Sequence, residues 1–301
     1  CTRTTDMNTK HCIFAALIAA CSAPVVAQLD DTLAKAQASG TITVGVRESS
    51  APLSYLLGSS KYVGYHVELC ERVLASLLPK VRVQYQPVTS QNRIPLVQNG
   101  TVDIECGSTT NNATRKQQVA FAVTTYITEA RLAVKAGSSI ERVEHLRGKM
   151  VATTTGTTLV QRLRKLERQG LTFNVVLGKD HADSFLLLES GRAEAFAMDD
   201  NTLAGNIANA KNPTDYKIVG EPLGVEPIAI MMRKDDPKLK AAVDGEIRKL
   251  MGNGELEKLY AKWFMQPIPP TGAVIGIPFP QTLKVAFQKP NDDPAEAYEK
   301  H

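Results

Sequence analysis

The chain has 301 residues, of which 43% are apolar, 22% charged and 6% aromatic, a length sufficient for two domains at roughly 100–200 residues each. This balanced composition excludes a disordered or collagen-like chain. Lys and Arg number 35 and Asp and Glu 31, a net charge of +4, but the two signs alternate along the sequence. Nucleic-acid binding is therefore disfavoured, because it calls for a clustered excess of positive charge.

The first 27 residues have the pattern of an export signal. Lys10 precedes an uncharged, mostly apolar run over residues 12–20, and small residues at 25–27 offer a cleavage site before Gln28. The apolar run is shorter than the ~20 residues that a transmembrane helix needs. We therefore expect a signal peptide over residues 1–27 and a mature protein in the periplasm.

A lipid anchor is the alternative outcome of export. Residues 18–21, Ile-Ala-Ala-Cys, resemble a bacterial lipobox. In that case cleavage would leave an acylated Cys21, which would tether the same domain to a membrane.

Two cysteines, Cys70 and Cys106, remain after the leader. An oxidising compartment favours a disulfide between them, but two buried thiols would fit the sequence equally well, since spacing alone does not fix the distance between them. A metal site is disfavoured, because His66 and Cys70 share a helix face without a second pair of ligands nearby.

The elements of the first half alternate between short β-branched runs and helical stretches, which is the pattern of an α/β protein. Val67, Cys70, Val73 and Leu74 recur at helical spacing and form a core stripe. In chain order we expect a strand at 41–46, a helix at 67–78, a strand at 81–85, a helix at 94–99 and a strand at 102–106.

A similar cycle begins after the polar break at 135–139. It consists of a strand at 149–153, a helix at 158–168, a strand at 173–177, a helix at 182–190 and strands at 195–198 and 228–232. Helices at 238–251 and 255–264 follow, and the prolines from Pro267 to Pro270 end the second of them.

Polar clusters follow the predicted strands, at the edge where open α/β sheets bind ligands. They contain hydroxyl groups, a glycine in a Thr-rich turn and three arginines, all of which suit a small anion. Each cluster taken alone could be a helix cap or turn, whereas four together favour a ligand site. They cover residues 47–50, 89–93, 108–115 and 154–158.

Two further residues stand at strand ends. His181 could donate to an anion when protonated, or cap a helix at the surface. Asp199 or Asp200 could accept an ammonium group, or cap the helix that follows. The sequence alone leaves these alternatives open.

Four segments carry a more specific resemblance: 89–96 (TSQNRIPL), 105–112 (ECGSTTNN), 179–181 (KDH) and 188–192 (LESGR). With 47–50 and 262–264, they resemble the family 3 solute-binding proteins of ABC uptake systems, and among these the periplasmic glutamate/aspartate binders. The resemblance runs from about residue 29 to 293, and departs from the pattern around residues 224–227.

The resemblance implies a type II periplasmic binding protein, a two-lobed α/β clamshell. Lobe 1 would comprise residues 28–132 and 229–301, and lobe 2 residues 133–228, with hinge strands near 131–134 and 228–231. We expect a monomer without a cofactor or metal, which delivers L-glutamate or L-aspartate to an ABC permease in the inner membrane.

The resemblance also assigns a ligand set. Arg115 would bind the α-carboxylate together with Ser108, Thr110 and a turn that includes Thr154 and Thr157. Asp199 would bind the α-ammonium, while the side-chain carboxylate would be surrounded by Arg47, Ser90, Arg93 and His181. Such a ligand carries two carboxylates and one ammonium, so a dry cleft needs an excess of cationic donors and one acid.

Two other classes share this fold. An exported enzyme resembling a dehydratase would need a catalytic group, and neither a G-x-S-x-G nor an H-E-x-x-H motif occurs. A sensor ectodomain would be followed by a membrane helix or a signalling domain. Recovery of unaltered ligand would favour transport over catalysis.

Overall fold

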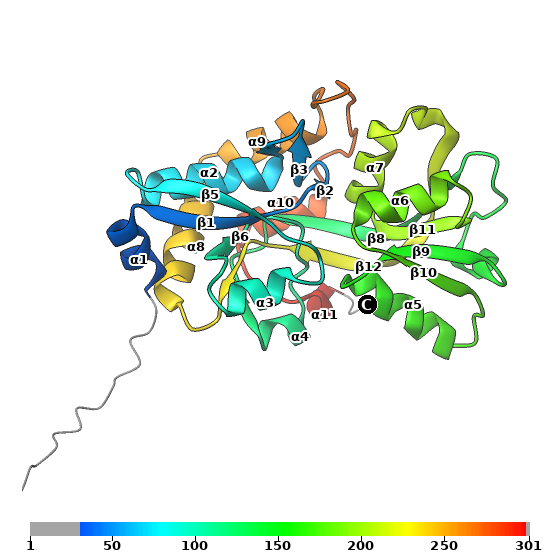
Figure 1. Ribbon diagram of the computed structural model, residues 1–301, viewed down its shortest axis with the longest axis horizontal. Coiled ribbons are helices and arrows are strands. Elements are labelled where there is room, and N and C mark those ends of the chain that lie inside the picture. Colours follow the sequence, from blue (N-terminus) through cyan, green and yellow to red (C-terminus); the bar gives the residue numbers. More distant parts are fainter. Residues whose placement is uncertain (1–30, 299–301) are drawn as a thin grey trace, which may run out of the picture.

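The computed structural model describes residues 31–298, which form two lobes side by side (Figure 1). The predicted signal peptide at 1–27 and the lipobox cysteine Cys21 lie outside these described residues. Within 31–298 no helix has the length and apolar character needed to cross a membrane.

The first lobe is built on a five-stranded sheet in the order β5-β1-β6-β13-β7. The strands β1, β5 and β6 are parallel, and β13 runs antiparallel to β6 and β7. Apolar residues on both faces of the sheet bury against helices, so each face has its own core cluster. The strands are β1 (Thr41–Val46), β5 (Arg82–Pro87), β6 (Ile104–Glu105), β7 (Val119–Phe121) and β13 (Met231–Arg233).

Helices cover both faces of this sheet. The larger cluster joins one face to α2 (Tyr65–Leu77), α8 (Pro237–Gly252) and α9 (Glu255–Phe264), and includes the predicted stripe of α2. The other face packs against α3 (Arg93–Gln98). The predicted helices at 67–78, 94–99, 238–251 and 255–264 thus correspond to helices within two residues at each end.

The second lobe contains the sheet β10-β9-β11-β8-β12. Its central strand β11 is buried along its whole length, between the parallel β9 and the antiparallel β8. The strands are β8 (Tyr126–Lys135), β9 (Met150–Thr154), β10 (Asn174–Gly178), β11 (Ala195–Asp199) and β12 (Tyr216–Ile228), and the helices α5 (Thr158–Arg168), α6 (His181–Glu189) and α7 (Asp200–Asn209).

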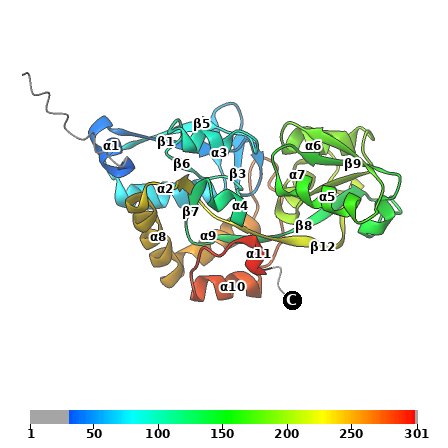
Figure 2. The ribbon, with the colours of Figure 1, turned by 90° about the horizontal axis from the view of Figure 1, so that it is seen from below.

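The chain passes between the lobes twice, from β7 to β8 and from β12 to β13. Figure 2 shows β8 and β12 running together from one lobe to the other, and their residues pair antiparallel. The predicted hinge segment 131–134 lies inside β8. The single strand predicted at 228–232 is wrong: Ile228 ends β12 and Met231 begins β13 in the other sheet. All five residues are fully buried, so the hydrophobic pattern continues where the chain changes sheets.

Several elements lack a strong signal in the sequence. The strand β7, most of β12, a small sheet of two- to four-residue strands and four further helices were not predicted. The small sheet consists of β2 (Ser49–Ser50), β3 (Ser54–Leu57) and β4 (Lys61–Val63), and the helices are α1 (Thr32–Ser39), α4 (Ala113–Lys116), α10 (Gln281–Gln288) and α11 (Ala295–Tyr298). Two short 3-10 turns lie at Val143–Leu146 and Pro213–Asp215.

A disulfide joins Cys70 in α2 to Cys106, which directly follows β6, with their Cα atoms 6.3 Å apart. Both residues are buried. The bond ties α2 to the strand end that leads into the polar segment at 107–112. It therefore fixes the start of a segment that the sequence predicts to bind ligand.

We expect reduction of this bond to destabilise the first lobe. The bond closes a loop with a sequence separation of 36 residues, and loops of this size contribute about 2–4 kcal/mol by restricting the unfolded chain. Urea unfolding with and without dithiothreitol should show this loss. The Cys70→Ala, Cys106→Ala double variant is the control, since its stability should not respond to the reductant. An equal response in both proteins would contradict the prediction.

Candidate functional site

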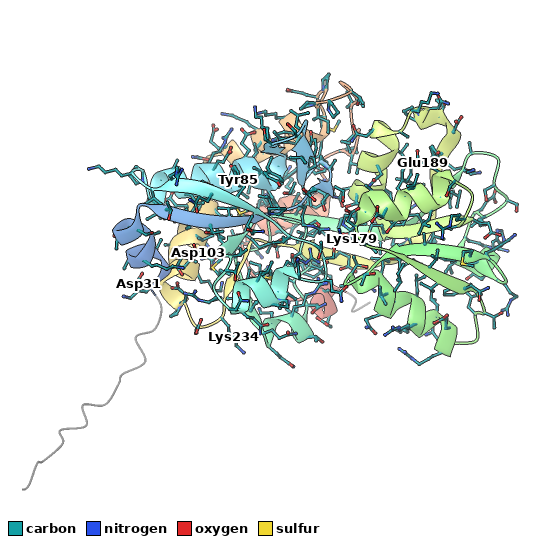
Figure 3. All side chains as sticks on the ribbon, viewed as in Figure 1. Asp31, Tyr85, Asp103, Lys179, Glu189 and Lys234 are labelled. Carbon is teal, nitrogen blue, oxygen red and sulfur yellow. A yellow bond between two sulfur atoms is a disulfide. The ribbon has the colours of Figure 1, made fainter. Side chains whose placement is uncertain are left out.

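The ends of strands from both lobes meet at the interface between them, and the ten residues predicted to bind ligand gather there. Eight of them line one pocket between the lobes: Ser90, Arg93, Ser108, Thr110, Arg115, Thr157, His181 and Asp199. Arg47 and Thr154 join them through hydrogen bonds to Ser108 and His181. All ten are buried. Lys179, two residues before His181, lies on the side of the second lobe that faces the first (Figure 3).

Arg47 lies directly after β1 and is 1% exposed. Its Nη1 donates to Ser108 Oγ at 3.2 Å and its Nη2 donates to His181 Nε2 at 3.5 Å, so that it contacts both lobes. Burial lowers the pKa of Arg47, and the nearby carboxylate of Glu105 raises it again in part. A guanidinium this deeply buried requires an anion close by.

Arg93 begins α3 and is 2% exposed. Its Nε and Nη1 are buried and have no hydrogen-bond partner among residues 31–298, and neither has the hydroxyl of Ser90. Burial, together with Arg115 and Arg47, lowers the pKa of Arg93 well below its usual value. Buried donors of this kind carry a desolvation cost that an anionic ligand would remove.

Arg115 is held by α4, a short helix whose N-cap Asn112 accepts from the backbone N–H of Arg115. Its Nη1 donates to Thr110 O at 2.9 Å and its Nη2 to Gly156 O at 3.2 Å. Gly156 belongs to the Thr-rich turn of the second lobe. The arginine therefore bridges the two polar segments that the sequence assigns to one carboxylate.

His181 is a neutral member of the site. Burial, together with Arg47 and Arg93, lowers the pKa of His181 well below its usual value. Its Nε2 accepts from Arg47, which leaves Nδ1 as the donor to Thr154 Oγ1 at 2.9 Å. The sequence analysis considered a protonated His181. The structure indicates instead a neutral ring that orients Arg47, since both ring nitrogens already have partners in the protein.

Asp199 ends β11 and is 1% exposed, with its Oδ1 unpaired among the described residues. Burial raises the pKa of Asp199 well above its usual value, and the carboxylates of Glu226 and Asp200 raise it further. Asp200 is paired with the hydroxyl of Thr128, so Asp199 is the acid that lines the pocket. A bound ammonium would stabilise its ionised form.

Two buried acids near the site were missed by the sequence analysis. Glu105 accepts from Thr109 Oγ1 at 2.8 Å and lies within electrostatic reach of all three arginines. Glu226 accepts from Arg162 Nε at 2.8 Å. The signal for Glu105 was present, because an acid within a run of buried strand residues requires a cationic partner.

The two lobes are in close contact at two glycines of the second lobe, where an added Cβ would clash with the first lobe. A Cβ on Gly156 would lie 2.6 Å from Gln91 Cα, and one on Gly205 in α7 would lie 2.2 Å from Ala51 O. Both neighbours belong to the first lobe. This close packing is the geometry of a closed cleft.

His66 lies in the first lobe and contacts two segments that lead to the site. It is fully buried, with Nδ1 2.6 Å from Gly107 O and Nε2 2.8 Å from Thr125 Oγ1. It thereby connects the segment before Ser108 to the passage between the lobes. No cluster of metal-ligating side chains occurs in the described part of the chain.

Comparison with known proteins identifies the family. The sequence profile of the bacterial extracellular solute-binding proteins, family 3, matches residues 42–266. The chain belongs to this family.

Two curated family 3 proteins are similar over almost their whole length. A protein of Pseudomonas aeruginosa described as an L-glutamate/L-aspartate-binding protein is 45% identical over 94% of this chain and 96% of its own. A glutamate/aspartate import solute-binding protein of Escherichia coli K12 is 43% identical over 92% of this chain and 96% of its own.

Solved structures share the type II fold of this family 3 chain. An ancestral arginine-binding protein bound to glutamine superposes with a TM-score of 0.69 at 29% identity, covering 75% of this chain and 98% of its own. An ancestral amino acid-binding protein described as a precursor of cyclohexadienyl dehydratase gives 0.69 at 27% identity, covering 77% and 99%. About a quarter of this chain is not covered by either of these structures.

We expect the buried His66 to make the protein less stable in acid. Burial lowers the pKa of His66 to about 4 from the 6.5 of an unfolded chain. As the pH falls below 6.5, the unfolded state takes up a proton that the folded state refuses, so stability declines until the pH reaches about 4. At pH 4.5 the loss from this residue is about 2–3 kcal/mol.

Urea unfolding at pH 7.5 and pH 4.5 measures this loss. The decrease in free energy of unfolding should be smaller in His66→Gln than in the wild type by that amount. His145→Gln, at a partly exposed histidine outside the site, is the matched control and should keep the wild-type decrease. The same decrease in all three proteins would show that folding does not lower the pKa of His66.

Proposed function

We propose that this protein captures L-glutamate or L-aspartate between its lobes and delivers it to an ABC permease. The names of two relatives at 43–45% identity over nearly full length support this ligand class. Export by the leader at 1–27 and a periplasmic location would fit the extracellular family.

The observation that carries the proposal is the charge balance of the buried groups of this pocket. The guanidinium groups of Arg47, Arg93 and Arg115 are buried beside Glu105 and Asp199, while the nearby Glu226 is already paired with Arg162. Among the three arginines and these two acids, with both acids ionised, one positive charge remains in excess. A zwitterion with one additional carboxylate carries the single negative charge that would neutralise it, and its carboxylate would pair the buried donors of Arg93.

The resemblance to the glutamate/aspartate binders assigns an end of the ligand to each group. Arg115, with Ser108, Thr110, Thr154 and Thr157 close by, would hold the α-carboxylate at the turn before α5, where the helix N-terminus also favours an anion. Asp199 would hold the α-ammonium on the same side.

The side-chain carboxylate would lie at the other end of the pocket. Arg47, Arg93 and Ser90 would donate to it, because Arg93 and Ser90 have buried donors to spare. The neutral His181 would act on this carboxylate through Arg47.

Ligand capture would couple to closure of the two lobes. In this proposal lobe 1 comprises residues 28–132 and 229–301 and lobe 2 residues 133–228, which move as a monomeric clamshell about the passages that join the sheets. A ligand that contacts both lobes stabilises the closed form by its preference for that form. The permease would then recognise the closed shape.

An enzyme on the same fold is the competing hypothesis, and one neighbour belongs to the ancestry of a dehydratase. In our proposal the polar groups of the pocket pair the charges of a bound zwitterion and carry out no reaction on it. Incubation with glutamate followed by mass spectrometry should return the ligand unaltered, whereas a changed mass would favour catalysis.

We predict that truncating the arginines separates the two ends of the ligand. Loss of one partner of a buried charge pair costs on the order of 2–5 kcal/mol, or roughly 30- to several-thousand-fold in affinity. Arg115→Ala should weaken glutamate and glutamine alike. Arg93→Met should weaken glutamate far more than glutamine, since the amide has no charge to pair.

Calorimetry with glutamate, aspartate, glutamine and asparagine measures these ratios. Each variant must first show an unchanged melting temperature without ligand. A glutamate-to-glutamine ratio that is equal in the wild type and in Arg93→Met would show that Arg93 is structural, and the ligand class would then be wrong.

A second prediction tests closure with a matched pair of helical glycines. Gly205→Ala should favour helix α7 by about 0.5–1 kcal/mol when the lobes are apart. Its Cβ would then clash with Ala51 O in the closed form, at a cost of about 1–3 kcal/mol. Glutamate affinity should therefore fall about 5- to 150-fold, although the ligand-free melting temperature is unchanged or raised.

Gly245→Ala in α8 is the control, because nothing lies within 4 Å of its added Cβ. It should raise the melting temperature without affecting affinity. Undiminished binding by Gly205→Ala would mean that the ligand-bound lobes do not approach as closely as they do here.

A further inference from the structure

The last described residues return to the ligand site. Residues 290–298, here called the C-terminal strap, follow α10 and include α11. Figure 2 shows α11 beside β12 at the junction of the lobes, far in sequence from the elements it touches. The strap lies against the segment from Thr110 to Lys116, which carries Thr110 and Arg115.

The strap holds Asn111 by main-chain and side-chain hydrogen bonds. The backbone N–H of Ala295 donates to Asn111 O at 2.9 Å. The Asn111 side-chain amide donates to the carbonyl groups of Asp292 at 2.8 Å and Asp293 at 3.3 Å. Asn111 is fully buried, so these bonds replace water on a residue adjacent to Thr110.

Two acids of the strap hold α4, the helix that bears Arg115. The Glu296 carboxylate accepts from the backbone N–H of Ala113, the first residue of α4, at 3.0 Å. Lys116 Nζ, in the last position of the helix, donates to Asp292 O at 2.7 Å and pairs with its carboxylate at 3.2 Å. A helix this short has too few internal bonds to be stable alone, so its orientation depends on such external partners.

The other side of the same segment is fixed by the passage between the lobes. Asn111 N–H donates to Pro227 O at 2.8 Å, and Thr110 forms an isolated bridge with Ile228. The segment is therefore held between β12 and the strap. Loss of the strap would leave it attached on one side only.

The strap also lies outside the part of the chain that defines the family. The family profile ends at residue 266. The ancestral arginine-binding protein is covered over 98% of its own length by only 75% of this chain. The residues that match the family profile therefore do not include the strap, so we ask whether it acts on the site and not on folding alone.

We propose that the C-terminal strap sets the position of Arg115, with Glu296 and Asp292 as positioning residues for α-carboxylate binding. This inference rests on the proposed function for its ligand. Its structural half, the immobilisation of residues 110–116, is independent of which ligand binds.

Hydrogen exchange measured without ligand tests the structural half. A chain ending at Lys289 should exchange the amides of residues 111–116 at least tenfold faster than the wild type, while the amides of β9 and β11 in the second lobe are unchanged. Equal exchange in 111–116 would overturn the proposal even if glutamate binds well. Conversely, failure of the wild type to bind glutamate would refute the proposed function without altering this readout.

Point variants test the binding half and avoid the risk that the truncated chain does not fold. Glu296→Ala should weaken glutamate and glutamine by the same factor, about two- to fivefold. Glu296→Gln keeps an acceptor for Ala113 N–H and should restore most of that affinity. Asp293→Ala is the matched control, because the Asp293 side chain is exposed and its bonds to the segment run through its backbone.

A double-mutant comparison tests whether Glu296 affects ligand affinity through Arg115. In the Arg115→Lys background, Glu296→Ala should have little further effect, whereas in the Arg93→Met background it should keep its full effect. Equal effects in both backgrounds, or a loss with Asp293→Ala as large as with Glu296→Ala, would overturn the positioning role.

Discussion

The burial of three guanidinium groups between the lobes is the constraint on which the rest of the structure depends. Arg47, Arg93 and Arg115 are at least nine-tenths buried, and burial is the largest cause of the lowered pKa of each. Removing a charge from water is expensive unless it is paired. The arrangement of the two lobes therefore requires negative charge beside the arginines, and Glu105 and Asp199 act on all three of them.

The surrounding structure keeps these arginines from relaxing toward solvent or toward one another. Glu105 provides a fixed counter-charge beneath them. The disulfide at Cys106, the His66 bond to Gly107 O and the strap all act on the single segment that follows β6. Preorganisation of this kind lowers the cost of ordering a site when a ligand binds, and these three sets of contacts all act on this one segment.

The sequence predicted some features of the fold and of the candidate site and missed others, and the difference has physical reasons. Polar clusters after strands located the site, because in an α/β sheet such positions converge at one edge whatever the details of the helices. Helices with a clear apolar stripe, such as α2, were placed within two residues. The change of sheet after Ile228 could not be predicted, since both sides of it are fully buried and apolar.

Other features could not be predicted because the information is distant in sequence. The protonation of His181 depends on Arg47, more than a hundred residues away. The contact of Glu296 with α4 spans 183 residues. A local pattern shows that a side chain is polar, whereas its role depends on which remote charge the fold brings to it.

The segment at 224–227, where the sequence departs from the expected family pattern, shows how such a remote charge is controlled. Glu226 is fully buried in β12 and raises the pKa of Asp199, which by itself would oppose ionisation of the acid assigned to the ammonium. Arg162 of α5 pairs with Glu226 and donates to Leu223 O across the register shift in β12. A Cβ on Gly224 would lie 2.0 Å from Arg162 Nη1, so only glycine leaves room for this guanidinium. The pairing reduces the negative potential at Asp199 and joins α5 to the strand that crosses between the lobes.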